Sequence, residues 1–157
     1  MTAPVLALIG GTGLYQLAGL DAVERHLVET PYGATSDALI AGTLAGRPVL
    51  FLARHGADHS LAPHEINYRA NLWALRELGA RRVLAINSVG GIGAAMAPQV
   101  LAVPEQLIDY TWGRAHTVFG AGGAVEHVDM GQPYDDALRA AVLAAAAASG
   151  VAMVAGG

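Results

Sequence analysis

The sequence predicts an α/β protein with a mixed central β-sheet flanked by helices. Short apolar runs without polar alternation are typical of strands covered on both faces. Several of these runs end in glycine-rich or polar turns, and one closely spaced pair of runs predicts an antiparallel hairpin. With 157 residues, the chain is long enough to bury a sizeable core, and we expect one domain spanning residues 1–157.

Composition excludes several classes of protein. Hydrophobic residues make up 54% and charged residues 14%, which favours a compact cytoplasmic enzyme domain with surface reserved for subunit contacts. The longest apolar run, 140–148, is shorter than the roughly 20 residues of a membrane span, and the N-terminus lacks a signal-peptide pattern. The chain has no cysteine, which excludes disulfides and thiolate metal sites. A net charge of −4 provides no basic face for nucleic acid.

The N-terminal residues combine a strand with a glycine-rich turn. Residues 5–9 form an apolar run, 10–13 read Gly-Gly-Thr-Gly, and 14–20 predict a short amphipathic helix. Backbone amides and a helix dipole make such a turn suitable for binding an anion, and Thr12 could add a hydroxyl. A dinucleotide fingerprint would need a small residue where Gln16 stands, and a simple tight turn is a further alternative.

The next segments predict antiparallel pairing. We expect a strand at 23–30, then a hairpin of strands 37–44 and 48–53 closed around residues 45–47. Antiparallel strands beside an N-terminal parallel element indicate a mixed sheet.

The most informative stretch is Arg54-His55-Gly56, which follows the buried strand 48–53. The forked donors of arginine, a second donor from histidine and the close backbone approach of glycine suit a phosphate or carboxylate. A strand end with solvated polar residues is the alternative. Metal binding by His55, His59 and His64 is not expected, since no carboxylate lies at ligand spacing.

A helix is predicted over residues 64–78, with Pro63 in its first turn and Gly79 after its end. Asn67 and Asn71, four residues apart, either tie down the Arg-His loop or are ordinary exposed asparagines.

The strand expected at 82–86 leads into a third polar turn, Asn87-Ser88-Val89-Gly90-Gly91. We expect the three turns to converge on one site, because each follows an apolar strand.

The remaining sequence predicts a strand-like run at 100–110, a long loop at 111–123, a helix from 133 to 149 and a strand from 151. Since the chain stops where another site loop is expected, we expect it to be incomplete at its C-terminus.

Together these motifs resemble one family over essentially the whole chain. The runs 9–14, 30–33, 52–56, 63–75 and 87–91 are similar to the trimeric purine nucleoside and methylthioadenosine phosphorylases. The runs 107–111 and 126–129 look most like the bacterial S-methyl-5′-thioinosine phosphorylases. The resemblance implies the phosphorylase/hydrolase-like fold and phosphorolysis of a purine 5′-methylthionucleoside, with methylthioadenosine or general purine nucleosides as alternative substrates. It also implies a homotrimer with shared active sites, inorganic phosphate as co-substrate, and no metal or other cofactor.

The family's functional positions can be carried over residue by residue. The phosphate ligands would be Thr12, Arg54, His55 and Asn87, and the substrate-binding positions would be Ser88, Val89, Gly90, His59, Pro63 and His127. Of these, His59 and Pro63 match the loop near the 5′-substituent, and His127 matches a residue that a neighbouring subunit lends to that pocket. The residue that protonates the purine is not identified in this sequence, and we expect it to lie in the family's C-terminal part.

Two rival functions remain. Histidine phosphatases also place Arg-His-Gly after a strand, although there it is the first strand and the histidine is phosphorylated. A non-catalytic nucleoside-binding or oligomeric module would follow if the chain really ended at Gly157.

Overall fold

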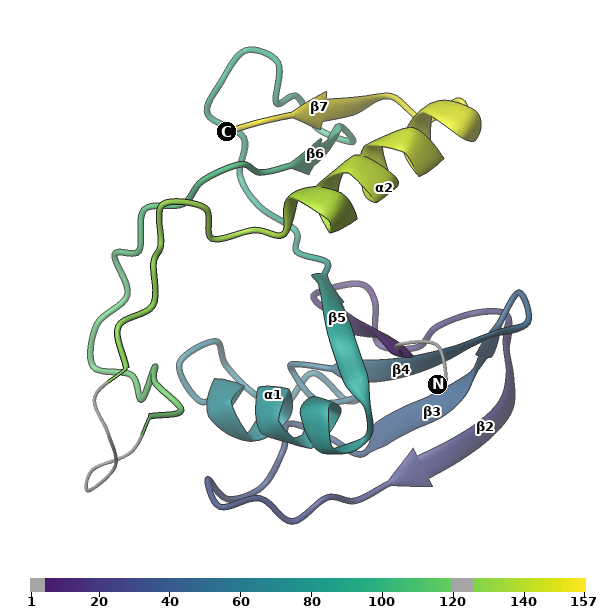
Figure 1. The fold of residues 1–157 in the computed structure, drawn as a ribbon, viewed down its shortest axis with the longest axis vertical. Coiled ribbons are helices and arrows are strands. Elements are labelled where there is room, and N and C mark those ends of the chain that lie inside the picture. Colours follow the sequence, from purple (N-terminus) through teal and green to yellow (C-terminus); the bar gives the residue numbers. More distant parts are fainter. Residues whose placement is uncertain (1–4, 120–125) are drawn as a thin grey trace. The chain divides into compact units, whose positions relative to one another are not determined.

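The computed structural model describes residues 5–119 and 126–157, which form two compact units. The first unit runs to Ser88 and also includes Gly113–Val118; the second comprises Val89–Trp112 and the residues from Phe119 onward (Figure 1).

A five-stranded sheet organises the first unit (Figure 1). Its strands are β1 (Val5–Gly10), β2 (Leu20–His26), β3 (Leu39–Leu44), β4 (Arg47–Ala53) and β5 (Ala80–Ala85), in the spatial order β2-β3-β4-β1-β5. Strand β1 is parallel to both β4 and β5, whereas β3 is antiparallel to β2 and β4. The mixed sheet is therefore confirmed, with its hairpin between β3 and β4.

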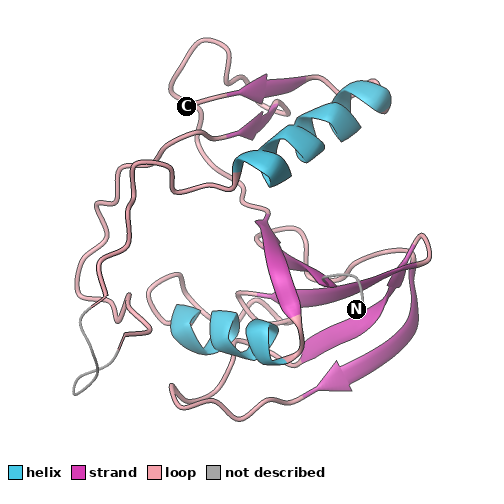
Figure 2. Ribbon diagram, viewed as in Figure 1, coloured by secondary structure: helices cyan, strands magenta, loops and turns pink. Residues whose placement is uncertain are grey.

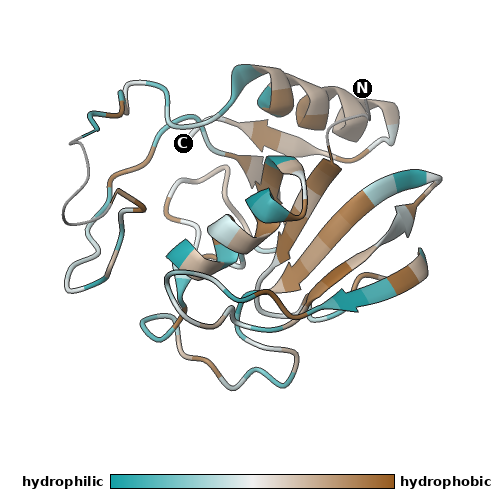
Figure 3. Ribbon diagram, turned by 60° about the horizontal axis from the view of Figure 1, so that its bottom comes forward, coloured by the Kyte–Doolittle hydropathy of each residue, from teal (hydrophilic) through white to brown (hydrophobic). Residues whose placement is uncertain are grey.

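The two faces of this sheet are covered differently. Helix α1 (Tyr68–Glu77) packs Ala74 and Leu75 against Leu39 and Leu52, and these four side chains are fully buried. Alternate residues of the same strands point to the other face, where Leu8, Phe51 and Ala53 form a second cluster. In Figure 3 the central strands are accordingly mostly brown.

Three predicted elements of the first unit are wrong in type or extent. Residues 14–19 form turns instead of a helix, because so short a segment has little helical stability of its own and β2 already begins at Leu20. Strand β2 ends at His26, not at residue 30. Helix α1 starts at Tyr68, four residues later than predicted, because the Asn67 side chain accepts from the Ala70 amide and forms the N-cap.

The second unit contains helix α2 (Asp136–Ala148) and two short parallel strands, β6 (Leu101–Val103) and β7 (Met153–Ala155) (Figure 2). The Asp135 carboxylate caps α2 by accepting from the Leu138 amide at 2.6 Å, so this predicted helix is confirmed. The strand predicted over 100–110 is only three residues long. The loop predicted at 111–123 contains no helix or strand up to Phe119, and its remainder lies outside the described residues. Neither α1 nor α2, the helices of the described residues, has the length and apolar character of a membrane-spanning segment.

Candidate functional site

The ends of three strands meet at one edge of the first unit's sheet. Strand β1 lies between β4 and β5 and runs parallel to both, so the three following turns emerge side by side. The Arg54 amide donates to the Gly10 carbonyl at 3.1 Å, and the Ile86 amide donates to the Ile9 carbonyl at 2.9 Å. These bonds extend the sheet one residue beyond β4 and β5 and bring the turns at 11–13, 54–56 and 87–88 together.

Arg54 is the centre of this group. Its guanidinium donates from Nε to His55 Nε2 at 3.2 Å and from Nη1 to Asn87 Oδ1. Three of the four residues expected to bind phosphate are thus joined directly. A guanidinium held at two of its nitrogens is oriented before any ligand arrives, which lowers the entropy lost on binding.

The guanidinium also lies close to the Gly11 backbone. A Cβ atom at Gly11 would lie 2.6 Å from Arg54 Nη2 and 2.6 Å from the Ile86 carbonyl oxygen. No side chain fits there without displacing one of them, so glycine is required at this position by close approach.

His55 is buried, with 6% of its surface exposed. Its Nδ1 atom lies 2.9 Å from the Leu61 carbonyl oxygen, and the Leu61 amide donates to the His55 carbonyl at 3.0 Å. A carbonyl only accepts and an arginine nitrogen only donates, so both contacts are satisfied when Nδ1 carries the proton and Nε2 accepts.

Thr12 and Ser88 connect the turns that follow β1 and β5. The Ser88 hydroxyl donates to the Thr12 carbonyl at 3.3 Å, and both residues are exposed. Thr12 therefore lies at the same sheet edge as Arg54.

The loop after Gly56 contains a second group of predicted residues. His59 is exposed and has a left-handed backbone (φ 57°), and its ring lies 5.4 Å from that of His55 and 5.3 Å from that of Tyr15, measured between centroids. Pro63 is exposed, and its carbonyl accepts from the Tyr68 hydroxyl at 3.0 Å. A hydrogen bond from Ser60 lowers the pKa of the neighbouring Asp58 carboxyl.

The three other predicted substrate residues, Val89, Gly90 and His127, belong to the second unit and are exposed. The cluster described above consists of first-unit residues only.

Asp37 supports the Arg-His loop, and the sequence did not indicate this. Its carboxylate accepts from the Ala57 amide at 2.6 Å and from the Ala38 amide at 2.7 Å, and it lies 3.6 Å from Arg25 Nη2. Asp37 is separated from the loop by 20 residues and by the β3–β4 hairpin, so no local pattern could reveal the contact.

Asn67 and Asn71 hold a different segment from the one expected. Asn67 donates to the Tyr32 carbonyl at 2.6 Å; Asn71, 3% exposed, accepts from the Ser36 amide and donates to its hydroxyl, both at 2.8 Å. Both asparagines therefore tie residues 32–36, and not the Arg-His loop, to α1. The alternative of an exposed asparagine is also wrong for Asn71, which is buried.

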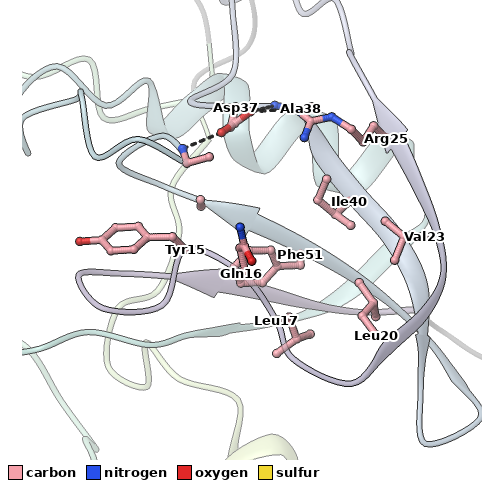
Figure 4. Close-up of a pocket in the computed structure, with 12 residues that line it drawn as sticks. Tyr15, Gln16, Leu17, Leu20, Val23, Arg25, Asp37, Ala38, Ile40 and Phe51 are labelled. Carbon is pink, nitrogen blue, oxygen red and sulfur yellow. Dashed lines mark hydrogen bonds and ion pairs between the residues drawn. The ribbon is translucent and has the colours of Figure 1, made fainter.

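A cavity of about 280 Å³ lies on the sheet face opposite α1 (Figure 4). Phe51, Ile40 and Leu20 form its apolar wall, and Asp37 with Arg25 forms a polar one. None of the predicted site residues lines it. Its apolar wall instead includes Phe51 and Ile40 of the second hydrophobic cluster.

No metal-ligating group was found in the described ranges: no three His, Asp or Glu side chains there are arranged to hold a metal ion.

Comparison with known proteins identifies the family. The model of the phosphorylase superfamily matches residues 5–157. The chain belongs to this superfamily. It is 58% identical to a probable S-methyl-5′-thioinosine phosphorylase of Xanthomonas campestris over 97% of this chain and 61% of that protein. It is 43% identical to an S-methyl-5′-thioadenosine phosphorylase of Hyperthermus butylicus over 90% of this chain and 51% of that protein.

Solved structures agree with the observed fold. Methylthioadenosine phosphorylase of Schistosoma mansoni in complex with adenine superposes with a TM-score of 0.90 at 34% identity, over 94% of this chain and 53% of that one. The phosphorylase fold is therefore confirmed. The chain spans about three fifths of the length of the thioinosine phosphorylases it matches.

Proposed function

We propose that this protein serves the phosphorolysis of a purine 5′-methylthionucleoside, with S-methyl-5′-thioinosine preferred, in purine salvage. The products are the free purine and 5-methylthioribose 1-phosphate. The names of the relatives support this substrate class, and thioinosine phosphorylases with 52–58% identity support the preference over methylthioadenosine.

The chemistry explains why an anion site belongs at this sheet edge. The bond between ribosyl C1′ and the purine nitrogen breaks through an oxocarbenium-like transition state, and the purine leaves with the electron pair. A phosphate oxygen then forms the new bond to C1′. Phosphate held beneath C1′ stabilises the developing positive charge and is already positioned for attack.

We assign phosphate binding to Thr12 and to the Arg54 guanidinium, together with His55 and Asn87, the two side chains that hold that guanidinium. The observation that carries this assignment is the Arg54 guanidinium, which His55 and Asn87 hold at the edge of the Gly11 turn. Two hydrogens on Nη2 and one on Nη1 remain for a ligand after these two bonds. The helix dipole that the sequence suggested at this turn is not part of the proposal, since residues 14–19 are not helical.

We assign the nucleoside to Ser88, Val89, Gly90, His59 and Pro63, and to His127 of a neighbouring copy. We also propose a homotrimer, in which neighbouring copies share these sites. Exposed apolar side chains in the second unit support subunit contacts: Ile108, Tyr110, Trp112, Val128 and Met130. We further propose that inorganic phosphate is the only co-substrate, that no metal or other cofactor takes part, and that the protein is cytoplasmic.

The test is purine release from S-methyl-5′-thioinosine, methylthioadenosine and inosine, each with and without inorganic phosphate. We expect phosphate-dependent release, fastest from methylthioinosine. The assay should be run on this chain and on the Xanthomonas relative, which supplies the additional length.

The outcomes separate the alternatives. Faster purine release from methylthioadenosine than from methylthioinosine would make methylthioadenosine the preferred substrate. A rate of purine release that does not depend on phosphate would exclude phosphorolysis. Nucleoside binding by this chain without turnover, beside an active relative, would identify the chain as a binding module.

A further inference from the structure

We propose that His55 is a positioning residue: it acts on phosphate through Arg54, by accepting from Arg54 Nε, and does not itself donate to the anion. This inference rests on the proposed function for the identity of the ligand. It differs from the simpler assignment, in which the imidazole is a second phosphate donor.

The hydrogen bonds of the ring define its tautomer. Nδ1 faces the Leu61 carbonyl at 2.9 Å, and Nε2 faces Arg54 Nε at 3.2 Å. Arginine nitrogens only donate and a carbonyl oxygen only accepts. With the proton on Nδ1, both contacts are satisfied. With the proton on Nε2, the lone pair of Nδ1 would face the Leu61 carbonyl oxygen, and the N–H groups of Nε2 and Arg54 Nε would face each other. An imidazolium would retain the second of these repulsions.

The ring is held firmly in this orientation. His55 is 6% exposed, and its backbone carbonyl accepts from the Leu61 amide at 3.0 Å. Residues 55 and 61 therefore bond to each other through backbone and side chain, which keeps the ring plane and Nε2 in place. Nε2 is consequently a fixed acceptor beside a flexible arginine side chain.

The Arg54 side chain is thereby oriented from one end. His55 holds Nε while Asn87 Oδ1 holds Nη1, so the Nη2 group remains for the anion. A phosphate that took a proton from His55 Nε2 would have to break the bond to Arg54 and invert the tautomer. Loss of the ring should therefore disorder the guanidinium without removing its charge.

The first experiment observes the tautomer directly. Long-range proton–nitrogen NMR spectra of the ¹⁵N-labelled chain distinguish protonated from bare imidazole nitrogens, and His55→Phe assigns the His55 signals. The exposed His64 serves as the reference ring. We expect His55 to show a protonated Nδ1 and a bare Nε2, both before and after addition of inorganic phosphate.

Two outcomes of this experiment overturn the inference: a protonated Nε2 in the free protein, or protonation of Nε2 on phosphate addition. Backbone amide shifts of Thr12 and Arg54 in the same titration report whether phosphate binds at all. If those amides do not move while the expected tautomer is seen, the proposed phosphate site fails and the histidine–arginine contact stands as structural only.

The second experiment measures coupling between the two side chains. His55→Phe keeps an aromatic ring of similar volume and removes both nitrogens. We expect it to weaken phosphate binding about tenfold, as for a hydrogen bond to a charged group, and His55→Gln, which restores an acceptor, to recover part of the loss. Arg54→Lys removes the Nε–H donor. In that background, His55→Phe should change phosphate affinity less than about twofold.

An equal loss in both backgrounds would mean that His55 contacts the anion independently of Arg54, and would overturn the proposal. Thermal unfolding of each variant, read by circular dichroism, establishes that the proteins compared are folded.

Discussion

The two units of the chain use the same kinds of element with different results. In the first unit, β1, β4 and β5 are six or seven residues long, and the turns that follow them are joined by the Arg54–Asn87 and Ser88–Thr12 hydrogen bonds. In the second unit, β6 and β7 have three residues each, and α2 buries only Ala146. Apolar side chains are thus buried in the first unit, where an extended sheet packs against them, and remain largely exposed in the second.

The units also differ in what they expose. Ile108, Tyr110 and Trp112 of the second unit are 77%, 86% and 90% exposed, whereas Leu39, Leu52 and Leu75 of the first are fully buried. Such large exposed apolar groups mark an interaction surface. The first unit therefore contains most of the buried core and the proposed anion site, and the second presents exposed apolar surface for contacts.

The largest expected effect tests where the stability resides. Leu75→Ala in α1 should lower the free energy of unfolding by about 2–5 kcal/mol, because it leaves a cavity in a closed core. Leu143→Ala in the less buried α2 is the matched control and should cost less than about 1.5 kcal/mol. Urea unfolding followed by circular dichroism measures both losses. Equal losses would contradict the comparison.

A second test compares a glycine turn in each unit. Gly11→Ala should weaken phosphate binding at least about tenfold, because the new Cβ displaces the Arg54 guanidinium or the β5 end. Gly93→Ala is the control, since a Cβ there would meet only Met96 at an ordinary 3.9 Å. Calorimetric titration with inorganic phosphate provides the affinities. An unchanged phosphate affinity in Gly11→Ala would show that the Arg54 guanidinium does not bind the phosphate.

The helix caps offer a smaller effect. Asp135→Ala should cost about 1 kcal/mol, the usual value for a lost N-cap. Asn67→Ala should cost about 1 kcal/mol more, because Asn67 also donates to the Tyr32 carbonyl and so anchors residues 32–36 to α1. Urea unfolding of the two variants decides the order. A larger loss for Asp135→Ala would show that the cross-link through Asn67 adds nothing.

The smallest expected effect concerns pH. The Ser60 hydrogen bond holds the pKa of Asp58 below its ordinary value of 3.8. The folded chain therefore gains from ionised Asp58 above that value, and the gain is lost as pH falls through the lowered pKa. Carboxyl NMR titration should show the midpoint below 3.8 in the parent and closer to 3.8 in Ser60→Ala. Identical midpoints would exclude the Ser60 contact as the cause.

Much of the first unit could be predicted from sequence because its signals are local. Apolar runs of six or seven residues followed by glycine or polar residues gave β1, β3 and β4 nearly to their ends. The same logic failed at 14–19, where a weak amphipathic pattern was outweighed by the pairing of Leu20 with Leu44. It also placed the start of α1 too early, since an asparagine cap competes with an upstream proline as a start signal.

The sequence alone determined that polar residues follow three apolar strands, because each apolar run and the polar residues after it are adjacent in the chain. It also determined the family, through motifs that the superfamily match confirms. Only the tertiary structure decided which of those residues touch. The bond from Arg54 to Asn87, the support of Ala57 by Asp37 and the orientation of His55 by Leu61 join residues 33, 20 and 6 positions apart. Such contacts depend on strand order and loop path, which no local pattern encodes.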